Sequence, residues 1–151
     1  MRGWVVILLV VVLAACAPAE PDPTAQMCAA AAQLEGARLI AAKAAVADQS
    51  GASAISLRLA QQARDAAQQS NAGLQAVASD ELKHGETWQA LLAASGFVVQ
   101  AANALLPGYE NTHGMTDAQL ASADRQFATA QKALPPNCFL PGINQPGSAG
   151  P

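Results

Sequence analysis

Aromatic and charged side chains are both scarce in this chain. Aromatic residues make up 4% of its 151 residues, and charged residues make up 13%. A core built from this composition has few large side chains to bury. The basic residues form no stripe, which argues against nucleic acid as a partner and against an electrostatic grip on anionic lipid. Low charge with abundant Ala and Gln also argues against disorder outside the chain ends.

Motifs for catalysis and for cofactor binding are absent as well. The sequence has no G-x-S-x-G turn to hold a nucleophile and no Gly-rich loop to hold a phosphate group. It has no C-x-x-C or C-x-x-C-H motif and no cluster of Cys and His. These absences predict that the protein is not an enzyme and holds no cofactor.

The sequence has no aliphatic run long enough for a membrane-spanning helix, which needs roughly 20 residues. Its longest run of Val, Ile and Leu covers only residues 5–13. The run follows a short segment with one positive charge, Arg2, and precedes the small residues Ala14 and Ala15. This arrangement is typical of a secretory signal peptide.

Residues 13–16 read Leu-Ala-Ala-Cys, and this tetrapeptide resembles the lipobox of bacterial lipoproteins. The resemblance covers residues 1–16. It implies cleavage of the signal peptide, residues 1–15, diacylglyceryl transfer to the Cys16 sulfur and acylation of the new amine. An uncleaved anchor, or an ordinary signal peptide cut near Ala17 or Ala19, is the alternative.

The residue after Cys16 bears on the location of the protein. It is Ala17 and not Asp. In a Gram-negative host, this resembles the signal for sorting to the outer membrane. In a Gram-positive host, the same lipidation implies the outer face of the plasma membrane. The expected location is therefore the bacterial cell envelope, with the membrane as a partner through the lipid on Cys16.

The mature chain has the length of one domain. Residues 16–23 are Pro-rich and predict a short extended tether. Residues 24–140 are expected to fold, and the Gly/Pro tail, residues 141–151, is expected to be disordered. Without Arg2 of the signal peptide, seven Lys and Arg residues stand against eleven Asp and Glu residues, a net charge of about −4.

The cysteines predict a disulfide. Three are present, and lipidation of Cys16 leaves Cys28 and Cys138. Export places both in an oxidising compartment, where an even pair usually forms a bridge. The alternative is two free buried thiols.

Apolar spacing and the breaks between periodic segments predict four helices and no strands. Thr24 is the expected cap of the first helix, and a capping box at Thr116 is expected to begin the fourth. The third begins either at Asp80 or after Gly85, and the sequence does not distinguish the two. The predicted ranges are 24–48, 53–78, 80–106 and 116–134.

Each predicted helix has an apolar face that we expect to be buried. In the first helix this face includes Cys28, Ala32, Leu39, Ala42 and Val46. In the second it includes Ile55, Leu59, Ala63, Ala66, Leu74 and Val77. In the third it includes Trp88, Leu91, Leu92, Ser95, Val98, Val99, Ala102 and Leu105. In the fourth it includes Leu120, Ala123, Phe127, Ala130 and Leu134.

Four helices with short connections predict an all-α fold, an antiparallel up-down-up-down four-helix bundle. In that topology the start of the first helix and the end of the fourth share one end, so one disulfide between Cys28 and Cys138 would staple the bundle. The opposite end, taken to include the boundary between the second and third helices, is expected to be free to meet a partner.

Two E-x-x-H motifs are the main metal-site candidates, since Met115 beside His113 offers only two ligands for copper. Paired motifs of this kind, with two further Glu residues, build di-iron sites in ferritin-like bundles. They are Glu81 with His84 and Glu110 with His113, and Glu35 and Glu86 are the available extras. The second motif falls in an expected loop, residues 107–114, and the first adjoins a helix boundary. We therefore interpret all four residues as solvated side chains and predict no metal.

The predicted function follows largely by elimination. We expect a membrane-tethered extracytoplasmic lipoprotein of the bacterial cell envelope that acts as a non-enzymatic structural or protein-interaction module, with an unknown envelope protein as partner. The alternative is a ligand- or metal-binding envelope lipoprotein. A hydrolase or redox enzyme is the third possibility.

Overall fold

The computed structural model describes residues 22–108 and 113–139, and this part of the chain is all-helical with no strand. The predicted fold class, all-α, is confirmed. The α-helices are α1 (Pro23–Gln49), α2 (Ser53–Gln75), α3 (Asp80–Lys83), α4 (Glu86–Ala104) and α5 (His113–Ala133), followed by the 3-10 helix η2 (Pro136–Phe139). The predicted signal peptide, Cys16, Glu110 and the predicted tail lie outside the described residues.

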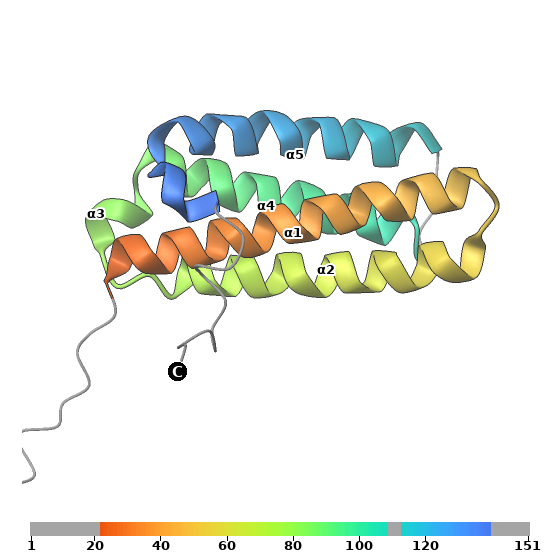
Figure 1. Cartoon of the computed structure of the whole chain (residues 1–151), viewed down its shortest axis with the longest axis horizontal. Coiled ribbons are helices and arrows are strands. Elements are labelled where there is room, and N and C mark those ends of the chain that lie inside the picture. Colours follow the sequence, from red (N-terminus) through yellow and green to blue (C-terminus); the bar gives the residue numbers. More distant parts are fainter. Residues whose placement is uncertain (1–21, 109–112, 140–151) are drawn as a thin grey trace, which may run out of the picture.

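The four long helices lie side by side (Figure 1). The most extensive packing joins α1 to α2 and α4 to α5, and α2 also packs against α4. We name the two ends of this body. The near end is where α1 begins and where α3 and η2 lie, and the far end is where the turn at residues 50–52 joins α1 to α2 (Figure 1). No helix in the described ranges is long and apolar enough to cross a membrane.

The start of α1 differs slightly from the prediction. Asp22, rather than Thr24, is the N-cap, and its side chain accepts a hydrogen bond of 3.0 Å from the Thr24 backbone N–H. Pro23 occupies the first helical turn, where its missing N–H is not needed. The helix ends before Gly51, whose φ of +77° suits glycine better than any other residue.

The sequence left two possible starts for the third helix, at Asp80 or after Gly85, and the structure has a helix beginning at each. Ser79 caps the single turn of α3, because its side chain accepts from the Leu82 backbone N–H. A longer helix, α4, begins after Gly85. The second helix also ends at Gln75, three residues before the predicted end.

The predicted start of the fourth helix is wrong. Helix α5 begins at His113, so Thr116 already lies inside it. A capping threonine must stand outside the helix with its oxygen directed at free backbone N–H groups. Here Thr116 is 3% exposed, and its hydroxyl has no hydrogen-bond partner among the described residues.

The core is built mainly from alanine with a few larger residues. Leu34, Leu74, Leu91 and Val98 are fully buried. The predicted faces of the last two long helices are confirmed at their centres, since Leu91, Val98, Ala123 and Phe127 are all buried. The core therefore depends on close approach of the helices rather than on large side chains.

The predicted face of the first helix is wrong apart from Cys28, which is buried, and one position of the second is also wrong. Leu39, Val46 and Ile55 are exposed, and the buried side of α1 holds Met27, Ala30, Ala31, Leu34, Ala37, Ala41 and Ala44. Helix α1 is apolar on almost every side, so periodicity alone does not select one face. Packing selects the side with small residues, because these let α2 come close: a Cβ added at Gly73 would lie 3.6 Å from the Ala30 Cβ.

Candidate functional site

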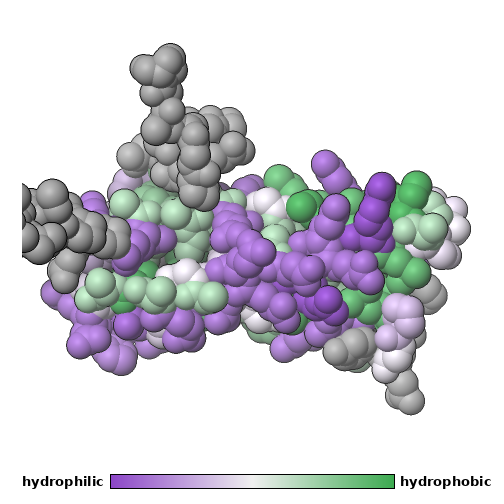
Figure 2. Space-filling model, turned by 90° about the horizontal axis from the view of Figure 1, so that it is seen from below, coloured by the Kyte–Doolittle hydropathy of each residue, from purple (hydrophilic) through white to green (hydrophobic). Residues whose placement is uncertain are grey.

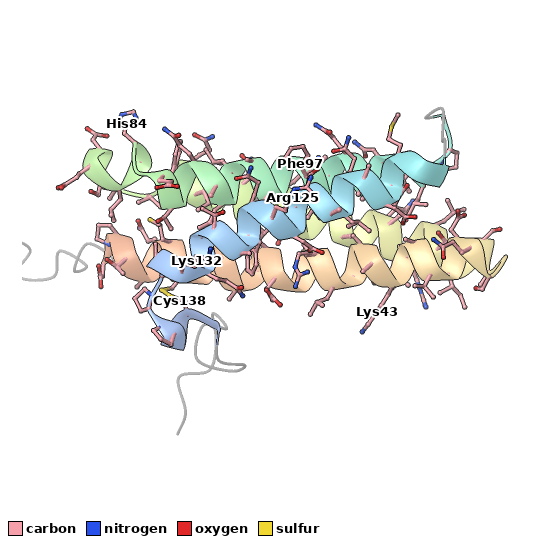
Figure 3. The ribbon with its side chains drawn as sticks, turned by 90° about the horizontal axis from the view of Figure 1, so that it is seen from above. Lys43, His84, Phe97, Arg125, Lys132 and Cys138 are labelled. Carbon is pink, nitrogen blue, oxygen red and sulfur yellow. A yellow bond between two sulfur atoms is a disulfide. The ribbon has the colours of Figure 1, made fainter. Side chains whose placement is uncertain are left out.

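The two predicted disulfide partners meet at the near end. The sulfur atoms of Cys28 and Cys138 lie 1.98 Å apart, at disulfide distance, and their Cα atoms lie 4.7 Å apart. Cys28 comes from the second turn of α1 and Cys138 from η2, which packs on α1 (Figure 3). Both cysteines are buried. Two cysteines that are 110 residues apart in the chain therefore meet at the end of the body from which the predicted tether departs.

Hydrogen bonds connect further segments at the same end. The Ala78 backbone N–H donates to the Gln26 side-chain oxygen over 3.1 Å. The Trp88 indole N–H donates to the Leu74 carbonyl oxygen over 2.8 Å. The end of α2 and the start of α4 are thereby held together, and the segment between them is tied to the start of α1.

This arrangement corrects the expected position of one boundary. The segment between the second and third predicted helices lies at the near end, beside Gln26, and not at the opposite end. The reason is that α1 and α2 have similar lengths, 27 and 23 residues, so α2 returns the chain to the level where α1 began.

The described residues of the two E-x-x-H motifs lie at opposite ends of the body, and Glu110 lies outside the described part of the chain. Glu81 is in the single turn of α3 and His84 directly follows it, and both are exposed at the near end (Figure 3). His113 begins α5 at the far end (Figure 1). Within the described residues, no three side chains among His, Cys, Asp and Glu are close enough together to hold a metal ion.

Glu35 and Glu86, the two further ligands considered from the sequence, do not meet either. Glu86 lies in the first turn of α4. Glu35 lies near the middle of α1, where it accepts a hydrogen bond of 3.1 Å from Arg38. The described residues therefore do not assemble the di-iron pattern that the motifs suggested.

Sequence reasoning missed one charged cluster, which joins α1 to α5. The Arg38 guanidinium donates to Glu35 on its own helix and to Asp124 on α5, and it lies 5.5 Å from the centre of the Phe127 ring. Burial alone would lower the pKa of Arg38, but the hydrogen bond to Asp124 and the charges of both carboxylates outweigh it and raise that pKa. The guanidinium therefore stays charged at every physiological pH.

The spacing of Glu35 and Arg38 was the available signal for this cluster. Residues three apart on a helix are neighbours, so their pairing is readable from the sequence. Asp124, 86 residues further along the chain, offers no such local signal. The cluster bridges two helices whose mutual packing is otherwise slight.

Apolar side chains are exposed on the half of α1 that leads to the far end and in the first turn of α2. Val46 is 65% exposed, Ile55 49% and Leu39 48%. Together with the exposed Ala42 and Lys43 they form what we call the outer strip. Figure 2 shows hydrophobic residues gathered at this end and a hydrophilic band across the middle of the face.

Comparison with protein-family models, curated proteins and solved structures finds no match to this chain. Its function must therefore be argued from its own residues. Two features of the structure bear on function. One is the near end, where several segments are connected next to the predicted lipid attachment, and the other is the outer strip.

Proposed function

We propose that this chain is a lipoprotein of the bacterial cell envelope, anchored by lipid on Cys16, whose body is a non-enzymatic structural or protein-interaction module. The observation that carries the proposal is the lipobox at residues 13–16, directly after the aliphatic run at residues 5–13. Ala17 favours the outer membrane of a Gram-negative host, and a Gram-positive host would place the anchor on the outer face of the plasma membrane.

The proposed architecture of the body is an up-down-up-down bundle stapled by a disulfide between Cys28 and Cys138. The disulfide distance and the hydrogen bonds at the near end support it. A bridge that closes a loop of about 110 residues contributes roughly 4–5 kcal/mol in the chain-entropy model. An alanine-rich core buries little apolar area per residue, so this contribution is large beside the total stability of a small domain.

The position of the bridge suits an anchored protein. Six residues, 17–22, separate Cys16 from α1. The near end, where the two cysteines meet, therefore stands within about 20 Å of the lipid. The cysteine pair and the hydrogen bonds that connect α1, α2 and α4 thus lie at the end that the anchor holds.

Substitution of Cys16 by Ser tests the anchor. The variant should keep residues 1–15 and carry no acyl groups, which intact-mass spectrometry of the membrane fraction measures directly. A normal lipidated mass for the variant would contradict the proposal.

Affinity capture from detergent-solubilised envelopes tests the interaction role. We expect an envelope protein to co-purify with the lipidated chain in a fixed ratio. The same preparation should contain no stoichiometric metal ion. A bound metal that is lost on His84→Ala would instead favour a metal-binding role.

A further inference from the structure

The outer strip has the spacing of a single helix face. Leu39, Ala42, Lys43 and Val46 follow each other at steps of three, one and three residues and lie on one side of α1. Ile55 adds an apolar side chain just beyond the α1–α2 turn. Isolated exposed apolar residues are normal on a protein surface, whereas a contiguous group indicates a contact with something else.

The strip carries a single charge. Lys43 points away from the body (Figure 3). The other charged side chains in the middle of α1, Glu35 and Arg38, pair with each other and with α5. An apolar helix face with one lysine and no carboxylate matches the interfacial region of a bilayer, where apolar groups enter the acyl boundary and a lysine extends to the lipid phosphates.

Chain length brings this face within reach of lipid. The six residues between Cys16 and α1 span at most about 20 Å, and α1, with 27 residues, is about 40 Å long. The first residue of α1 is therefore held close to the membrane. A body that lies on its side along α1 meets this restraint without stretching the tether.

The small area of the strip favours lipid over a second copy of the chain. Stable interfaces between proteins bury at least about 1,200 Å² in total, far more than five side chains supply. Contact with the anchoring membrane has no such requirement, because the anchor already confines the body and gives the second contact a high effective concentration.

We infer that the outer strip rests on the membrane surface, so that α1 lies along the lipid and the body lies flat rather than standing on its near end. This inference depends on the proposed anchor at Cys16. Leu39, Val46 and Ile55 enter the interface between headgroups and acyl chains, and Lys43 binds lipid phosphate.

Tryptophan quenching by brominated lipid tests this orientation. The lipidated full-length mature protein is reconstituted in vesicles of phosphatidylethanolamine and phosphatidylglycerol with brominated acyl chains. Val46→Trp reports on the strip, and Gln100→Trp, at an exposed position of α4, is the matched control. The wild-type chain supplies the Trp88 background. We expect quenching of the Val46→Trp signal to exceed that of the control by about twofold or more.

Each other outcome has a definite meaning. Equal quenching at both positions, with the protein sedimenting with the vesicles, overturns the orientation and leaves the anchor intact. Protein that does not sediment with the vesicles overturns the anchor and the orientation together. A Val46→Trp signal protected from both an aqueous quencher and brominated lipid means that protein covers the strip, which also overturns the inference.

A charge change provides a second test in folded protein. Lys43→Glu lies on the exposed surface and is not expected to disturb the helices, which circular dichroism verifies. In the Val46→Trp background it should reduce quenching by about half in vesicles rich in phosphatidylglycerol, because like charges repel. Gln61→Glu, an exposed change on α2, is the control, and an equal reduction by both would contradict a role for Lys43.

Discussion

The near end and the far end of the body are held together in different ways. The near end combines the Cys28–Cys138 pair with hydrogen bonds that connect Gln26 to Ala78 and Trp88 to Leu74. The far end is packed through a small separate cluster of buried apolar residues, Ala44, Ala45, Ala60, Leu105 and Leu106. These hydrogen bonds and the proposed disulfide thus lie together where the proposed anchor is attached.

The far end also contains polar groups that the described structure leaves unpaired. Four buried side-chain oxygens there have no hydrogen-bond partner among the described residues, those of Ser56, Asn103, Thr116 and Gln119. A buried unpaired group destabilises by roughly 1–3 kcal/mol. From this difference we expect local stability to decrease from the near end to the far end. Local unfolding should therefore begin at the far end.

Removal of both cysteines should have the largest effect on the difference in stability between the near end and the far end. Cys28→Ala with Cys138→Ala should lower the free energy of unfolding by about 4 kcal/mol, because the unfolded chain regains the entropy that the closed loop removed. Urea denaturation under non-reducing conditions measures this. A midpoint equal to that of the wild type would mean that the near end does not depend on the bridge.

Truncation of one leucine at each end compares their packing. Leu74→Ala removes a fully buried near-end side chain and should cost about 3 kcal/mol. Leu106→Ala at the far end, where the side chain is 7% exposed and its surroundings can relax, should cost about 2 kcal/mol. Thermal and urea unfolding of the two variants measure both values, and the reverse order would contradict the proposed gradient.

Two hydroxyl deletions should have effects of opposite sign. Thr116→Val removes an unpaired buried hydroxyl and should stabilise the body by about 1 kcal/mol. Ser70→Ala removes a hydroxyl that donates to the Ala30 carbonyl over 2.8 Å and should destabilise it by about 1 kcal/mol. Equal effects in urea unfolding would show that the Thr116 hydroxyl is satisfied in solution.

The charged cluster of Arg38, Glu35 and Asp124, which lies between the two ends, should contribute least to the free energy of unfolding. Arg38→Gln is expected to cost below about 1 kcal/mol, because Asp124 is 54% exposed and solvent screens the pair. The raised pKa of Arg38 stabilises the fold at every pH below the pKa that Arg38 has in the unfolded chain, and this contribution is lost only as pH rises through the folded pKa. Urea midpoints of wild type and variant at pH 6 and pH 9 should therefore differ by the same amount, and a pH-dependent difference would contradict this account.

The sequence was sufficient for the features that local spacing determines. The four helical segments, the buried centres of α4 and α5 and the meeting of Cys28 with Cys138 were all predicted. Breaks at Gly and Pro and a regular apolar spacing are local signals, and the cysteine pair follows from the number of cysteines and the expected export.

The prediction of the buried face of α1 failed because several faces of this helix are equally apolar. Helix α1 contains so many alanines that Leu39 and Val46 gave the stronger periodic signal, whereas close approach of α2 at Ala30 and Gly73 decided which side is buried. The contact between Arg38 and Asp124 also depends on how α1 and α5 lie in space, which neither segment encodes alone.

The location of Cys28, five residues into α1, has a mechanical consequence. A pull on the anchor is transmitted along the tether to the first turn of α1. With the proposed bridge in place, the load passes at Cys28 into η2 and α5, so the helix cannot be peeled away one turn at a time from its beginning. The force must instead shear several helices together, and the body should resist unfolding by such a pull far better than its modest core would suggest.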